Sequence, residues 1–185
     1  MAEYYLISQL PSLDGLGDSA PLPIDEDRFL ALCRFLLGTK AQKAMQELTI
    51  APPKEPSATS SSLLSLWYEK ERELRLALGK VRAEKLHKAF DYQNKSFSTE
   101  LMKIVNDAVE NTSPLEAEKL LFSYRISVLE ALRPTDMFCE DYVFYYGLKL
   151  KLLARMRVFD TARGESAYRK IYNSILTGER TEVNP

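Results

Sequence analysis

His87 is the one side chain of this sequence whose ordinary pKa lies near neutrality, so it is the first candidate for acid–base chemistry. Asp91 follows it by four residues in a stretch predicted to be helical, and side chains at this spacing can touch. A small hydrolase that uses His87 is therefore one hypothesis. The sequence offers no nucleophile to join this pair. It also offers no phosphate-binding loop, because no third glycine follows Gly15 and Gly17 at the spacing that such a loop requires. We therefore expect no enzymatic activity and no catalytic residue.

The two cysteines, Cys33 and Cys139, lie far apart in the chain and, with one histidine, are too few for a Cys/His zinc site. Cys33 falls on the apolar side of a predicted helix and Cys139 stands beside Phe138. Both are expected to be small core residues. The sequence thus predicts no metal site, and its few glycines predict no nucleotide site or other cofactor.

Basic side chains gather near the end of the chain, where residues 147–172 hold seven Lys or Arg against two acidic residues. Such a segment could form a docking face for an acidic partner, since opposite charges steer encounter and set orientation. The alternative is that these residues solvate the ends of helices, as charge runs usually do. The candidate partner-binding residues are Lys149, Lys151, Arg155, Arg157, Arg163, Arg169 and Lys170.

Composition excludes several other classes of protein. Over 185 residues, 25 Lys and Arg balance 26 Asp and Glu, so no overall positive field draws the chain to nucleic acid or to an anionic membrane. No run approaches the roughly 18 apolar residues of a membrane span, and no signal peptide is recognisable at the start. We expect a cytoplasmic protein with reduced thiols, no nucleic-acid partner and no insertion into a membrane.

The residues that must position these side chains favour helix over strand. Leucine occurs 28 times and alanine 16 times, against 14 valines and isoleucines together. The sequence predicts an all-α fold, a helical bundle of about six to seven helices with a long central helix and an extended N-terminal arm. Apolar spacing and capping residues place the arm at residues 4–11 and the helices at 25–38, 39–48, 62–90, 98–110, 113–132, 136–158 and 161–176.

Four segments follow from this pattern. Residues 1–50 form the arm and a helical hairpin, residues 51–62 a linker rich in proline and serine, residues 63–177 the main helical domain, and residues 178–185 a flexible tail. The stretch 136–158 is apolar on most sides and is expected to be the central helix. We expect the last three helices to pack as one rigid body.

Several stretches resemble known proteins. Residues 74–86 (LRLALGKVRAEKL) resemble a segment of the C-type stalk protein of V-type ATP synthases. Residues 4–11 (YYLISQLP), 114–119 (PLEAEK), 146–155 (YGLKLKLLAR), the pair 159–160 and Gly164 resemble an uncharacterised bacterial family encoded beside V-type ATP synthase genes.

This resemblance implies an all-helical protein that belongs to or assembles with a rotary ATPase, similar to the central-stalk protein that joins the soluble head to the membrane rotor. The C-type stalk protein is considerably longer, so a chain of 185 residues would supply only part of such a socket. The implied function is that of a non-enzymatic subunit or accessory factor in coupling or assembly. Its partners would be V-type ATP synthase subunits, reached from the cytoplasm at the periphery of the inner membrane. The alternative is a free-standing helical adaptor or regulator.

Overall fold

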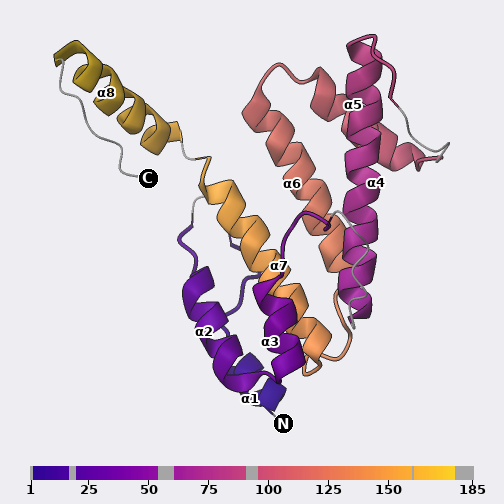
Figure 1. Ribbon diagram of the computed structural model, residues 1–185, viewed down its shortest axis with the longest axis vertical. Helices are drawn as coiled ribbons and strands as arrows, with labels where there is room; N and C mark the ends of the chain where they lie inside the picture. Colours follow the sequence, from indigo (N-terminus) through magenta and orange to yellow (C-terminus); the bar gives the residue numbers. More distant parts are fainter. Residues whose placement is uncertain (1, 17–19, 54–60, 91–95, 160, 178–185) are drawn as a thin grey trace.

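A computed structural model describes residues 2–16, 20–53, 61–90, 96–159 and 161–177 of the chain (Figure 1). Every regular element in these ranges is a helix, which confirms the predicted all-α fold. The helices are α1 (Ala2–Gln9), α2 (Glu26–Leu36), α3 (Thr39–Gln46), α4 (Ser62–Lys85), α5 (Thr99–Glu110), α6 (Pro114–Ala131), α7 (Glu140–Arg157) and α8 (Thr161–Thr177).

Short polar side chains begin four of these helices. Asp25, Ser61, Ser98 and Ser113 each accept a hydrogen bond from the backbone N–H three residues later. Each bond satisfies a donor that a helix start leaves unpaired, so the local sequence favours these boundaries. At Ser113 the N–H donates to Asn111 Oδ1 at 2.9 Å, in place of the Glu116 carboxylate that a full capping box would use.

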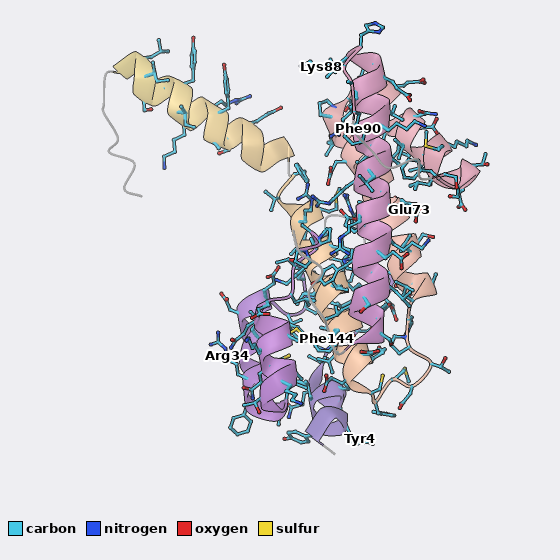
Figure 2. All side chains as sticks on the ribbon, turned by 45° about the vertical axis from the view of Figure 1, so that its right-hand side comes forward. Tyr4, Arg34, Glu73, Lys88, Phe90 and Phe144 are labelled. Carbon is cyan, nitrogen blue, oxygen red and sulfur yellow. The ribbon has the colours of Figure 1, made fainter. Side chains whose placement is uncertain are left out.

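Helix α7 is enclosed by the other helices along most of its length. Its eight residues from 143 to 150 are all buried, and it contacts α1, α2, α3, α4 and α6. Phe144 lies among these helices in Figure 2. Gly147 permits the close approach of α2 and α3, because a Cβ there would stand 3.1 Å from Phe29 of α2 and 3.2 Å from Met45 of α3.

The buried side chains form two hydrophobic clusters. The larger surrounds α7 and takes in α1, α2, α3, the start of α4 and the end of α6. The smaller lies between the second half of α4, helix α5 and the first half of α6. Helices α4 and α6 therefore run through both clusters and join them.

The prediction for the N-terminal segment is wrong, because residues 4–11 do not form an extended arm. Residues up to Gln9 form α1, which buries Leu6 completely against the larger cluster. Pro11 only terminates this helix, and its carbonyl accepts a 2.8 Å hydrogen bond from the Tyr146 hydroxyl of α7. Aromatic residues and a proline favour an extended segment locally, but the burial of Leu6 against distant parts of the chain stabilises a helix.

The predicted linker at 51–62 separates segments that share one core. Leu6, Phe29 and Met45 from the first 50 residues belong to the same cluster as Trp67 and Phe144. The Trp67 indole N–H also donates to the Ile50 carbonyl at 3.2 Å. Residues 54–60 of this segment, and the predicted tail at 178–185, lie outside the described residues.

Candidate protein-interaction site

Helix α8 carries a row of large apolar side chains that no other described helix covers. Members of the row recur every three to four residues, at position 168, at 171 and 172, and at 175 and 176, and so share one face of the helix. They are 51% to 73% exposed, and α8 packs against no other helix within the described ranges. The row consists of Tyr168, Ile171, Tyr172, Ile175 and Leu176.

Figure 1 shows α8 standing apart from the other helices, beyond the end of α7. The expectation that the last three predicted helices form one rigid body is therefore wrong for α8, although α6 and α7 do pack together. The prediction of a helix at residues 161–176 is confirmed, but none of the other described helices covers the apolar residues of α8. An apolar helix face of this kind is typical of a segment that docks into a groove of a partner.

The seven basic residues singled out in the sequence divide into two groups. Arg169 and Lys170 lie exposed on α8, and Arg163 belongs to the same helix, although its side chain lies outside the described residues. Arg169 is 3.9 Å from the Glu165 carboxylate, one turn earlier on α8. The other four residues lie on α7.

Those four α7 residues bind other parts of the same chain. Lys151 donates to Glu26 at 2.8 Å, Arg155 to Glu118 at 2.9 Å and Arg157 to the Ala20 carbonyl at 2.7 Å. Lys149 is buried and donates to Asp14 and Glu130. The seven residues therefore do not lie together on one face, and the members on α7 hold that helix to its neighbours.

The Lys149 cluster is the most polar part of the larger core. Burial alone would lower the pKa of Lys149, but hydrogen bonds to Asp14, Glu130 and Tyr145 outweigh it and raise that pKa. Its hydrogen bond lowers the pKa of Asp14, and bonds from Lys149 and Tyr145 overcome the burial of Glu130 to lower its pKa as well. A cavity of about 260 Å³ opens over this cluster. Every charge in the cluster has a partner of opposite sign, which indicates a structural role.

A second buried ion pair lies where the two hydrophobic clusters meet. Glu71 of α4 accepts two hydrogen bonds of 3.0 Å from Arg125 of α6, and a third of 3.0 Å from Arg75. Arg125 also lies 3.8 Å from Glu118, to which Arg155 of α7 donates. These contacts link α4, α6 and α7 through charged side chains.

A groove lies on the surface where α5 meets α6. Its volume is about 520 Å³ and its walls are largely apolar, with Leu120 at 38% exposure on the α6 side. Small residues of α6 recur along it at four-residue intervals, namely Ser123, Ser127 and Ala131. This groove is a further apolar surface that no other described helix covers.

His87 occupies the turn that ends α4. Its φ is +51°, its N–H donates to the Glu84 carbonyl, and the N–H of Lys88 donates to the Ala83 carbonyl. This is the Schellman arrangement that usually carries glycine at the left-handed position. Asp91 lies outside the described residues, so the hypothesis of a hydrolase that uses His87 and Asp91 stays a prediction.

The two cysteines differ in their surroundings. Cys33 lies in the core, as expected, and burial raises the pKa of its thiol to about 12. Cys139 is only half-buried, because it is the N-cap residue of α7, which corrects the prediction for this residue. Among the described residues, no group of three or more His, Cys, Asp or Glu could hold a metal ion.

Across the same ranges, no helix combines the length and apolar character that crossing a membrane requires. Comparison of the chain with known protein families, curated proteins and solved structures found no match. The part of the chain that the structure describes is thus all-α, and none of its other helices covers the amphipathic helix α8.

Proposed function

We propose that the protein is a non-enzymatic helical subunit or accessory factor of a bacterial V-type ATP synthase, acting in coupling or assembly through protein contacts. The observation that supports a binding role is the uncovered apolar face of α8. Soluble proteins seldom expose such a row of large side chains unless it binds another surface. The choice of complex is supported by the resemblance of residues 74–86 to the C-type stalk protein, and of residues 146–155 to an uncharacterised family encoded beside V-type ATP synthase genes.

The side chains of α8 indicate what kind of partner surface would bind this helix. Its apolar face requires an apolar groove, which is how amphipathic helices bind partner proteins. Arg163, Arg169 and Lys170 outnumber Glu165 on this helix, so the edge of that groove should be acidic. The other described helices form the packed body from which α8 extends.

A pull-down from detergent-solubilised native membranes tests this proposal. The tagged protein should recover V-type head or stalk proteins that mass spectrometry identifies by sequence. Ile171→Asp should reduce that recovery at least tenfold, because a carboxylate cannot enter an apolar groove without losing its hydration. The Ile171→Asp protein should be as helical as the unmodified protein, because Ile171 is 60% exposed.

Asn173→Asp is the matched control, because it adds the same charge on the polar side of α8. Its recovery of ATP synthase subunits should equal that of the unmodified protein. Equal recovery by Ile171→Asp would refute the role of α8. Recovery of other proteins without any ATP synthase subunit would refute the proposed complex and favour the free-standing adaptor.

A further inference from the structure

The cavity over the Lys149 cluster is lined by α1 and the segment that follows it, by Arg133 just beyond the end of α6, and by α7. Its volume is about 260 Å³. Pockets for drug-sized ligands measure about 300–1,000 Å³, so this cavity suits a smaller molecule. Its walls combine charged side chains and tyrosine hydroxyls with the apolar side chains of Ile7, Leu10 and Leu13.

Lys149 itself has no hydrogen-bond donor left for a ligand. An ammonium group carries three N–H donors. Those of Lys149 go to Asp14 Oδ1, to Glu130 Oε1 and to the Tyr145 hydroxyl. A charged ligand group must therefore bind through the other charged side chains of the cavity.

The guanidinium of Arg133 is different, because its carboxylate neighbours stand too far away for hydrogen bonds. It lies 3.7 Å from Asp14 Oδ2 and 3.9 Å from Glu130 Oε2, against roughly 2.7–3.2 Å for a hydrogen bond. Its carbon Cζ stands 5.9 Å and 5.7 Å from the ring centroids of Tyr142 and Tyr145, so cation–π attraction holds it in place. The planar donors of a guanidinium match a carboxylate, which they bind through two parallel hydrogen bonds.

Charge balance selects the class of ligand. The two cations Lys149 and Arg133 pair with the two carboxylates Asp14 and Glu130, so these four side chains together are neutral. A ligand with one charge would leave that charge uncompensated in a partly buried site, which costs free energy. A zwitterion adds no net charge. Its negative group can accept from Arg133, while its positive group donates to Asp14 Oδ2, the oxygen that Lys149 does not bind.

The spacing of these two side chains fits an α-amino acid. The ammonium and carboxylate of an amino acid are joined through one carbon by bonds of about 1.5 Å, so their polar atoms stand about 3 Å apart. The Arg133 nitrogen and the Asp14 oxygen that would bind them are 3.7 Å apart, so both contacts can form side by side. An apolar side chain of the amino acid would meet Ile7, Leu10 and Leu13 in the same cavity.

The α7 wall of the cavity is shielded enough from water to strengthen such contacts. Burial raises the pKa of Tyr145 to about 12 and also raises that of Tyr146, so both hydroxyls are neutral at physiological pH. Hydrogen bonds to charged groups are stronger in such surroundings than in water. Side chains with shifted pKa values, here also Lys149, Asp14 and Glu130, often gather at binding sites.

We infer that this cavity binds a free α-amino acid with an apolar side chain. The carboxylate of the ligand accepts hydrogen bonds from Arg133, and its ammonium group donates to Asp14. The bound amino acid thus joins the segment after α1 to the end of α6. This site is separate from the apolar face of α8, so the inference goes beyond the proposed function and does not depend on it.

Isothermal titration calorimetry of the full chain with L-leucine tests this inference. Leucine should bind at one site per chain. Arg133→Gln and Asp14→Asn should each raise the Kd at least tenfold, because each removes a hydrogen bond between charged groups. Arg34→Gln is the matched control, since Arg34 is exposed on α2 and does not line the cavity. Its Kd for leucine should equal that of the unmodified protein.

Two analogues of leucine test the same contacts on the unmodified protein, so this result does not depend on how a variant folds. Isocaproate keeps the carboxylate and the apolar body of leucine but lacks the ammonium group. Isoamylamine keeps the ammonium group and lacks the carboxylate. Each analogue should bind at least tenfold more weakly than leucine.

Three results would overturn the inference. No binding of leucine at concentrations up to about 10 mM would show that the cavity takes no such amino acid. An Arg133→Gln protein that binds leucine as tightly as the unmodified protein would place the binding elsewhere. Isocaproate that binds as tightly as leucine would show that the ammonium group is not recognised. The pull-down through α8 is independent of all three, so the proposed function stands or fails separately.

Discussion

Removing the negative charge of Glu71 is expected to destabilise the protein by about 3 kcal/mol. Its side chain is 1% exposed, and that of its partner Arg125 is 10% exposed. Glu71→Gln keeps the size and shape of the side chain but leaves the guanidinium of Arg125 buried without its main counter-charge. The two residues come from α4 and α6, at the junction of the two hydrophobic clusters.

The size of this effect follows from the contacts that are lost. A hydrogen bond to a charged group contributes roughly 1.5–3 kcal/mol, and removing one partner of a buried pair costs about 3–5 kcal/mol in total. Glu118, at 3.8 Å from Arg125, still offers a carboxylate after the substitution. We therefore expect the lower end of that range. Replacing both partners, as Glu71→Met with Arg125→Leu, should restore stability to within about 1 kcal/mol of the unmodified protein.

Urea denaturation provides the measurement, followed by far-ultraviolet circular dichroism and by the fluorescence of the single tryptophan, Trp67. Trp67 lies in the larger cluster, whereas circular dichroism reports all the helices, so coincident transitions would show that both clusters unfold together. Arg75→Ala is the matched control. It removes another hydrogen bond to Glu71, but its side chain is 51% exposed, so the cost should stay below about 1 kcal/mol. A Glu71→Gln protein as stable as the Arg75→Ala protein would refute this reasoning.

Two further substitutions test the core around α7. Gly147→Ala should destabilise the protein by about 1–2 kcal/mol, because crowding of the packed core exceeds the roughly 1 kcal/mol that alanine gains in a helix. Lys149→Met should cost about 1–2 kcal/mol at neutral pH, a figure reduced for its partly exposed partners. It should also reduce the loss of stability in acid. Because Lys149 lowers the pKa values of Asp14 and Glu130, their contribution is full above the ordinary values of 3.8 and 4.5 and is lost as pH falls below them. Urea titrations at several pH values measure both effects.

Matched controls separate these mechanisms from general damage. Gly79 lies in the second half of α4, and Gly79→Ala gains the same helix propensity. The Phe90 ring that its Cβ would meet is 37% exposed and can move aside. This substitution should be neutral or stabilising. Lys151→Met removes a neighbouring lysine whose partner is Glu26, and it should leave the acid dependence unchanged. A Gly147→Ala protein as stable as the Gly79→Ala protein would contradict the close packing of α2 and α3 on α7.

Helix positions could be predicted because the signals are local. Capping by Asp25 and Ser113 depends on residues three positions away, and both of these predicted caps are present. The apolar run around Phe144 likewise indicates a helix that is buried on most sides. The helix at residues 2–9 could not be predicted in this way, because it depends on a surface formed by distant parts of the chain.

The role of the basic residues likewise could not be predicted from local sequence. Lys149 pairs with Asp14 across 135 positions, and Lys151 pairs with Glu26 across 125. Counting charge within residues 147–172 detects the lysines and arginines but not these distant carboxylates. A local excess of positive charge can therefore mark either a docking face or the inner contacts of a central helix, and only the fold distinguishes them.

The position of α8 follows from how α7 is covered. A helix buried on most sides requires several neighbours, and α1, α2, α3, α4 and α6 already supply them in the described chain. Because those helices cover the sides of α7, helix α8 does not pack its apolar face against α7. The apolar spacing of residues 168–176 predicts that this face must be buried, and the packing of α7 means that the burying surface lies elsewhere. Within the described residues, the α8 face is thus left uncovered because other helices already surround α7.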